Sequence, residues 1–264
     1  MKKNNAAGTV SQSNTEGIRL FHYALTDSTN KRAREYAQST DTPELPALFV
    51  ADGQSEGRGR LGRSFFSPKG TGLYMTLLLP SPKSGEQFAR LTSLSAVAVL
   101  EAIECRLGVK TQIKWVNDLY LDGKKVAGIL AESFEASGIR CVALGVGVNI
   151  RTKDFPEFLG LKAGSLLESS QRFDVEQRLE LAAQISKRII KALECEDTGE
   201  YMKKYREASC VIGKAIKITK NGSEQHGVAL DINGDGALSV LLDSGERVEL
   251  TSGEISLFVE EGEK

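Results

Sequence analysis

Residues 57–63 alternate glycine and arginine in a pattern that suits the binding of an anion. Their order is Gly57, Arg58, Gly59, Arg60, Leu61, Gly62, Arg63. Glycine lets the backbone approach a ligand closely, and the guanidinium fork matches the oxygens of phosphates and carboxylates. The segment is therefore a candidate anion-binding loop, although a mobile, solvated basic loop would have the same composition.

The same segment satisfies the pattern G-x-G-x-x-G, which in dinucleotide-binding proteins lies between a strand and a helix. Here the chain runs through residues 63–68 into the apolar segment LYMTLLL at 73–79, so no helix N-terminus follows the glycines. A nucleic-acid-binding patch is disfavoured because 34 Lys and Arg are balanced by 35 Asp and Glu, a formal net charge of -1. We therefore expect neither a dinucleotide fingerprint nor a nucleic-acid partner.

Two later segments add polar groups. KWVND at 114–118 places a cation, an aromatic ring and two short polar groups at the end of a strand, and Lys125 follows. GVGVN at 145–149 is a strand with two interior glycines, which cost stability and often mark the close approach of a ligand or another backbone. Ordinary roles remain open for each of them: a core ring, turn-forming polar residues, solvated lysines and tight strand packing.

The surrounding pattern predicts an α+β domain, a mixed sheet backed by helices. Helices are expected after the N-capping cluster 27–30, over 87–107 with Gly108 as the stop, and over 173–193. Strands are expected at 18–23, 48–51, 73–79, 113–115, 126–132 and 141–150.

From about residue 211 short alternating runs are separated by turns at 221–222, 233–236 and 243–245, which predicts a small β-barrel of about five strands. We expect a disordered tail over 1–17, a catalytic domain over 18–210 and the barrel over 211–264. The tail lacks the apolar stretch of a signal peptide, and no apolar run is long enough for a membrane span. Four dispersed cysteines and two histidines predict reduced thiols, no zinc site and a cytoplasmic protein.

Taken together, GRGRLGRSFFSP, KWVNDL, KVAGIL and GVGVN, in this order and spacing, resemble the catalytic domain of biotin protein ligases. DSTN at 27–30 and the small C-terminal domain fit as well, so the resemblance covers nearly the whole chain. It implies the class II aminoacyl-tRNA synthetase-like fold of biotin and lipoate ligases, with an SH3-like C-terminal barrel. It also implies activation of biotin with ATP to biotinyl-5'-AMP and transfer of biotin to a lysine of the biotin carboxyl carrier protein or domain of a carboxylase.

The resemblance also implies a role for individual residues. For biotin the set is Ser28, Thr29, Asn30, Gln54, Gly57, Arg58, Gly59, Arg60, Lys125, Gly128 and Gly145. For ATP and the adenylate it is Arg60, Arg63, Phe65, Lys114, Asn117, Asp118, Lys125 and Asn149, with Gly147 in the pocket wall. The catalytic set is Lys125, Arg58, Arg63, Lys114 and Asp118, and Asp118 is also expected to hold Mg²⁺.

These residue types suit that chemistry. An anionic carboxylate must attack an anionic phosphate, and their repulsion is about 4 kcal/mol per charge pair at ~4 Å with an effective dielectric constant of ~20. The substrate carboxylate is itself the nucleophile, so positive charge and alignment are what the protein must supply. We further expect residues 55–65 to order over the intermediate and exclude water.

Three alternatives remain. A lipoate or octanoate ligase would share the fold, but Ser28, Thr29 and Gln54 favour a ureido ring over an alkyl tail. A biotin-responsive DNA-binding repressor would need an N-terminal helix-turn-helix, for which about 17 polar residues are too few. A catalytically inactive biotin-binding module is disfavoured by the intact set of cations. The resemblance allows a homodimer.

Overall fold

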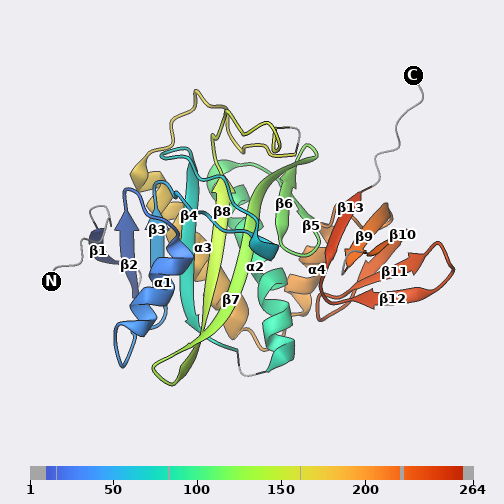
Figure 1. The fold of residues 1–264 in the computed structure, drawn as a ribbon, viewed down its shortest axis with the longest axis horizontal. Helices are drawn as coiled ribbons and strands as arrows, with labels where there is room; N and C mark the ends of the chain where they lie inside the picture. Colours follow the sequence, from blue (N-terminus) through green and yellow to red (C-terminus); the bar gives the residue numbers. More distant parts are fainter. Residues whose placement is uncertain (1–9, 16, 83, 161, 221–222, 258–264) are drawn as a thin grey trace.

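One large mixed sheet forms the body of the molecule, and a smaller antiparallel sheet lies at its side (Figure 1). The computed structural model describes residues 10–15, 17–82, 84–160, 162–220 and 223–257. Within these residues the large sheet has eight strands in the order β1-β2-β3-β4-β8-β7-β6-β5. The strands are β1 (Val10–Thr15), β2 (Ile18–Tyr23), β3 (Ala47–Ala51), β4 (Gly72–Pro80), β5 (Gln112–Lys114), β6 (Asp118–Leu121), β7 (Lys124–Ala136) and β8 (Ile139–Asn149).

Helices cover both faces of this sheet, as the expected α+β layer requires. Helix α1 (Thr29–Gln38) packs on the front face, where Ala33 and Ala37 share an apolar cluster with β2, β3 and β8. Helices α2 (Gly85–Leu107) and α3 (Val175–Glu194) pack together on the back face, over a larger cluster that continues into α4 (Gly199–Glu207). Because α1 has only ten residues, it covers only part of the front face of the sheet.

Local sequence signals account for the ends of the long helices. Ser84 and Gln87 form a capping box at the start of α2, and Asp174 and Gln177 form another at the start of α3. Each box satisfies two backbone N–H groups that lack helical partners. Gly108 ends α2 with φ 67°, a left-handed conformation that glycine adopts without steric cost, so the predicted stop is confirmed.

The C-terminal residues form the second sheet, in the order β12-β11-β10-β9-β13. Its five strands in the described residues confirm the predicted number, and two of the three predicted turns join them; the turn at 221–222 lies outside the described residues. The strands are β9 (Ala215–Lys220), β10 (Ser223–Ile232), β11 (Leu238–Leu242), β12 (Arg247–Leu250) and β13 (Glu254–Leu257). Trp115 ties the two sheets together, because its buried indole Nε1 donates to the Gly236 carbonyl oxygen at 2.9 Å.

Three elements differ from the sequence-based expectation. Residues 10–15 were expected in a disordered tail but form β1, which pairs antiparallel with β2; residues 1–9 lie outside the described part. Strand β6 and helix α4 were not predicted. The polar β1 is a strand because β2 offers it a free edge, which its own pattern does not reveal. No helix in the described part of the chain is long and apolar enough to cross a membrane.

Candidate functional site

Three glycines form the floor of a site on the front face of the large sheet. Gly145 on β8 lies between Thr76 of β4 and Leu130 of β7 in the strand register. Gly147, on the same face two residues later, lies between Tyr74 of β4 and Gly128 of β7. Strand residues two apart lie on the same face of a sheet. Because these glycines carry no side chains, the strand backbone itself forms the surface beside α1, and we call this surface the floor.

A chain of buried and partly buried hydrogen bonds borders this floor at the start of α1. Gln54 Oε1 accepts from the Thr29 backbone N–H at 2.8 Å and lies 3.2 Å from the Thr29 hydroxyl. The Thr76 hydroxyl lies 2.8 Å from Thr29 Oγ1 and donates to Asn30 Oδ1 at 2.6 Å. Asn30 Nδ2 in turn donates to Glu132 at 2.8 Å. Residues from α1, β4, β7 and the loop after β3 are thereby held in one arrangement.

The first turn of α1 is held by the Asp27 carboxylate and not by the side chain of its N-cap residue, Ser28. Ser28 makes no side-chain capping bond, and its side chain is buried. The Asp27 carboxylate accepts from the Ser28 N–H at 2.7 Å and forms ion pairs with Lys31 and Arg32. Burial raises the pKa of Asp27, but these ion pairs and the Ser28 bond outweigh it and hold the pKa well below its usual range. Ser28 Oγ is thus not used for helix capping.

The arginine–glycine loop folds back on itself as a small hairpin. Arg58 and Ser64 form an antiparallel bridge, and the 3-10 turn η1 (Arg60–Gly62) closes it with Leu61 at φ 55°. Gly57 must lack a side chain, because a Cβ there would lie 2.4 Å from the Phe65 carbonyl oxygen. The Arg58 side chain is exposed.

Arg60 and Arg63 both reach the C-terminal domain. Arg60 donates to Asn117 Oδ1 at 2.9 Å and to the Gly253 carbonyl oxygen at 3.3 Å. Arg63 forms an ion pair with Glu254 at 2.6 Å. The two arginines expected to meet the nucleotide are therefore held by β13 and the residue before it.

The remaining cations lie at the β5–β7 end of the floor. Lys125 Nζ forms an ion pair with Asp118 at 2.7 Å, and a Cβ on Gly128 would lie 3.2 Å from the same ammonium. Lys114 Nζ donates to the Tyr120 hydroxyl at 3.3 Å and lies over that ring. Burial lowers the pKa of Lys114 and outweighs the attraction of Asp118.

A ring and an amide complete the surface between these groups. The Phe65 ring packs directly on Gly147, where a Cβ would lie 2.6 Å from Cε1. Asn149, 4% exposed, donates through Nδ2 to the Gly164 carbonyl oxygen at 3.1 Å. Its Oδ1 is buried without a hydrogen-bond partner in the described residues. A buried acceptor left unpaired is costly, so this atom is able to accept a hydrogen bond from a ligand.

The structure brings the polar set together near α1, and Lys114 and Lys125 together near β6, around one floor. It does not bring Arg58, which is exposed, or Arg63, which pairs with Glu254, into contact with that floor.

Sequence reasoning missed several side-chain partners of these residues, among them Thr76, Glu132 and Glu254. Thr76 carried a signal, because it is a hydroxyl inside the apolar strand LYMTLLL, and it is fully buried. Glu132 and Glu254 carried none, since only the tertiary fold brings them to Asn30 and Arg63.

The protein groups near Asp118 limit the ways in which a metal ion could be bound there. The described residues contain no cluster of three or more His, Cys, Asp or Glu that could hold one. Mg²⁺ commonly uses one or two carboxylates together with substrate phosphates and water. Asp118 fits that arrangement, whereas a metal site built from protein groups alone does not.

Comparisons with known proteins identify the family of this chain. Residues 22–149 match the model of the biotin/lipoate A/B protein ligase family, and residues 211–257 match the biotin protein ligase C-terminal domain. The biotin–[acetyl-CoA-carboxylase] ligase of Paracoccus denitrificans is 30% identical over 235 residues, which are 85% of this chain and 95% of the relative. Bifunctional ligase/repressor BirA of Bacillus subtilis is 40% identical over 157 residues, 58% of this chain and 48% of the relative, so the chain spans about half the length of relatives of that kind.

Among solved structures, a biotin protein ligase from Aquifex aeolicus in complex with biotin and ATP superposes with a TM-score of 0.75 at 29% identity. The match covers 90% of this chain and 98% of that one. The fold and these matches thus place the chain in the biotin/lipoate A/B protein ligase family. Within that larger family, the chain belongs to the biotin protein ligase family.

Proposed function

We propose that this protein activates biotin with ATP and transfers the biotinyl group to a lysine of a biotin carboxyl carrier protein or domain. The observation that carries the proposal is the glycine floor with hydrogen-bonding groups at one end and cations at the other. Such a floor accepts a flat, polar ring whose tail ends in an anion.

The biotin ring would lie over Gly145 with its ureido group toward the start of α1. Ser28 and Thr29 supply hydroxyls there, and Gln54 and Asn30 supply amides already fixed by the buried chain. Fixed partners reduce the ordering cost of binding. A ureido ring offers the Ser28 hydroxyl and the remaining lone pairs of this chain a polar partner that an alkyl tail does not, which disfavours lipoate and octanoate.

The carboxylate of biotin would point toward Lys125 and meet the α-phosphate of ATP there. Lys125 and Lys114 supply positive charge from one side, and Arg58, Arg60 and Arg63 supply it from the loop. Each attraction offsets part of a repulsion of about 4 kcal/mol at ~4 Å. Arg63 would exchange Glu254 for the phosphates when ATP binds.

The adenine would lie beside the Phe65 ring, with its amino group donating to the free Oδ1 of Asn149. Asn117 stays bonded to the Ile129 carbonyl oxygen at 2.8 Å and keeps Arg60 oriented. Mg²⁺ would arrive with the nucleotide, with Asp118 as its protein ligand, and would neutralise phosphate charge.

In the second step the acceptor lysine attacks the mixed anhydride and AMP leaves. Of the carboxylates described at the site, Asp118 lies beside Lys125 and is the one that we propose takes the lysine proton. Residues 55–65 exclude water from the anhydride by closing over it. The ATP requirement and the carboxylase acceptor favour the cytoplasm as the place of the reaction.

Biotin-dependent exchange of labelled pyrophosphate into ATP tests the first step. We expect exchange with biotin, none with lipoate or octanoate, and a fall of at least about a hundredfold in Lys125→Ala, since removing one transition-state charge contact costs about 2.7–4 kcal/mol. Lys124→Ala is the matched control, because that neighbouring side chain is exposed on the hairpin and should leave exchange unchanged. Exchange driven by lipoate or octanoate alone would assign the protein to the rival ligases, and no exchange with any acid would overturn the proposal.

A further inference from the structure

The ligand-binding loop leaves the sheet and returns to it through a narrow neck. Strands β3 and β4 pair antiparallel up to Ala51 and Tyr74, and residues 52–71 between them carry Gln54 and the arginine–glycine hairpin. At the neck the Gly70 N–H donates to the Asp52 carbonyl oxygen at 2.8 Å. The position of the whole loop therefore depends on how these two chain ends are held.

Arg178 of α3 reaches this neck from the back of the sheet. Its Nε donates to the Gly72 carbonyl oxygen at 2.8 Å, and its Nη1 donates to Asp52 Oδ1 at 2.9 Å. One rigid guanidinium thus binds both ends of the loop. The side chain is 2% exposed, which makes it one of the largest fully buried side chains in the described part of the molecule.

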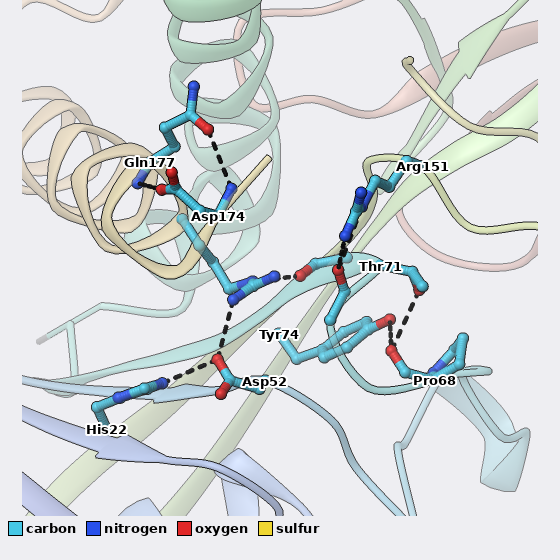
Figure 2. A network of polar contacts seen from close by, with 11 residues as sticks. His22, Asp52, Pro68, Thr71, Tyr74, Arg151, Asp174 and Gln177 are labelled. Atoms are coloured by element: carbon cyan, nitrogen blue, oxygen red, sulfur yellow. Dashed lines mark hydrogen bonds and ion pairs between the residues drawn. The ribbon is translucent and has the colours of Figure 1, made fainter. Parts of the chain in front are cut away.

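Further contacts complete the neck, as Figure 2 shows. His22 Nε2 lies 2.9 Å from the same Asp52 oxygen that Arg178 binds. Arg151 donates to the Gly70 carbonyl oxygen, and the Tyr74 hydroxyl donates to the Pro68 carbonyl oxygen at 3.0 Å. The returning end of the loop, residues 68–70, is therefore fixed by Tyr74 of β4 and by Arg151, two residues after β8.

A buried arginine is not explained by stability alone. Burial lowers the pKa of Arg178, which records the cost of placing its charge in the core, and Asp52 only partly offsets this. Replacing a buried ion pair with apolar residues is often neutral or stabilising, so the charge calls for another reason. The reason that its geometry offers is directional: an apolar side chain at this position of α3 could not bind the Gly72 carbonyl and the Asp52 carboxylate together.

We propose that Arg178 is a positioning residue for the ligand-binding loop. It fixes Asp52 and Gly72, so that Gln54, two residues beyond Asp52, stays bonded to Thr29 and the hairpin stays seated on the floor. Arg178 itself does not touch the substrate. The proposal rests on the proposed function for its ligand, but its claim about the order of the loop concerns the ligand-free protein.

Two substitutions at Arg178 separate the effect of its paired hydrogen bonds from the effect of its positive charge. Arg178→Met keeps an unbranched side chain without donors, and Arg178→Lys keeps the charge without the fork. We expect Arg178→Met to raise the biotin KM about tenfold or more, the size expected for loss of charge-assisted hydrogen bonds, with a smaller change in kcat. Trypsin cleavage after Arg58, Arg60 and Arg63 of the ligand-free protein, located by mass spectrometry, should accelerate by a similar factor. Arg178→Lys should fall between Arg178→Met and the wild type.

Ile189→Ala is the matched control for loss of stability. Ile189 is fully buried on α3, eleven residues and so about 16 Å along the helix from Arg178. It should lower the melting temperature while leaving the biotin KM and the loop cleavage rate unchanged. Asp52→Asn removes the charge but keeps an acceptor for Arg178, so it should change the biotin KM and the loop cleavage rate in the same direction as Arg178→Met by a smaller factor, and it serves as the test if Arg178→Met does not fold.

The outcomes distinguish this proposal from the proposed function. Unchanged KM and cleavage rate in Arg178→Met and Asp52→Asn, or changes equal to those of Ile189→Ala, would overturn the positioning role. If the wild type shows no biotin-dependent exchange, the proposed function fails instead, and the cleavage rate of the ligand-free loop still decides the role of Arg178.

Discussion

Gly145 offers the sharpest test of how the floor of the site is built. A Cβ at this position would lie 2.4 Å from Asn30 Oδ1 and 3.2 Å from both Cγ and Nδ2. Ordinary contact begins at 3.4 Å, so in Gly145→Ala the Asn30 side chain must move by about 1 Å. Asn30 is 6% exposed and already holds Thr76 and Glu132, so it has no free direction in which to move.

The expected cost follows from the bonds that this movement breaks. The bond to Thr76 is worth about 0.5–1.5 kcal/mol and the bond to the Glu132 carboxylate about 1.5–3 kcal/mol, which together come to about 2–4.5 kcal/mol. Glu132 is half-buried, so water recovers part of this in the free protein. We therefore expect the free energy of unfolding to fall by about 2 kcal/mol and the biotin KM to rise at least about tenfold.

Urea denaturation and the biotin KM in pyrophosphate exchange measure the two effects. A double-mutant cycle with Asn30→Ala isolates the cause, because removing that side chain removes the overlap. In the Asn30→Ala background, Gly145→Ala should change the free energy of unfolding by no more than about 0.5 kcal/mol. If the two substitutions are instead additive, the overlap with Asn30 is not what requires glycine, and the reasoning about the floor is wrong.

Three further predictions concern the cationic end and the loop. Because burial lowers the pKa of Lys114 below the ordinary 10.5, ATP affinity should fall as the pH rises through that lowered pKa. Titration calorimetry from pH 7.5 to 10 should show this fall in the wild type and not in Lys114→Arg. An equal fall of affinity in both proteins would contradict the prediction. Glu254→Gln should cost under about 1 kcal/mol of stability, since Arg63 is largely exposed, yet lower the ATP KM by up to about fivefold; a raised KM would show that Glu254 does not compete with phosphate. Biotin plus ATP should protect residues 55–65 from trypsin, and equal cleavage with and without ligands would refute closure of the loop.

The sequence by itself determined the elements whose causes are local. The start of α1 after Asp27, the stop of α2 at Gly108 and the turns of the C-terminal sheet each depend on a few neighbouring residues. Apolar periodicity placed β4 and α3 for the same reason, because a helix or strand buries one face whatever its partner is. The loop and strand motifs likewise predicted which residues gather at the site, because their order along the chain carries the family resemblance.

Tertiary structure alone decided the elements and contacts whose partners are remote in the chain. Strand β1 is polar and exists through pairing with β2, and α4 is short, with only Met202 and Tyr205 buried. The interior glycines of β8 indicated a close approach, but only the register and the fold show that Asn30 and Phe65 are what approach them.

The partners of Arg178 and Arg63 were likewise decided by the tertiary structure alone. Arg178 reads in the sequence as one charge in an amphipathic helix, and Arg63 as one cation in a basic loop. Their partners, Asp52 at 126 residues' separation and Glu254 at 191, are set by the packing of α3 behind the sheet and of the C-terminal domain beside it. A pairing over such a distance has no local signature, because the free energy that selects it comes from the burial of many apolar side chains elsewhere in the molecule.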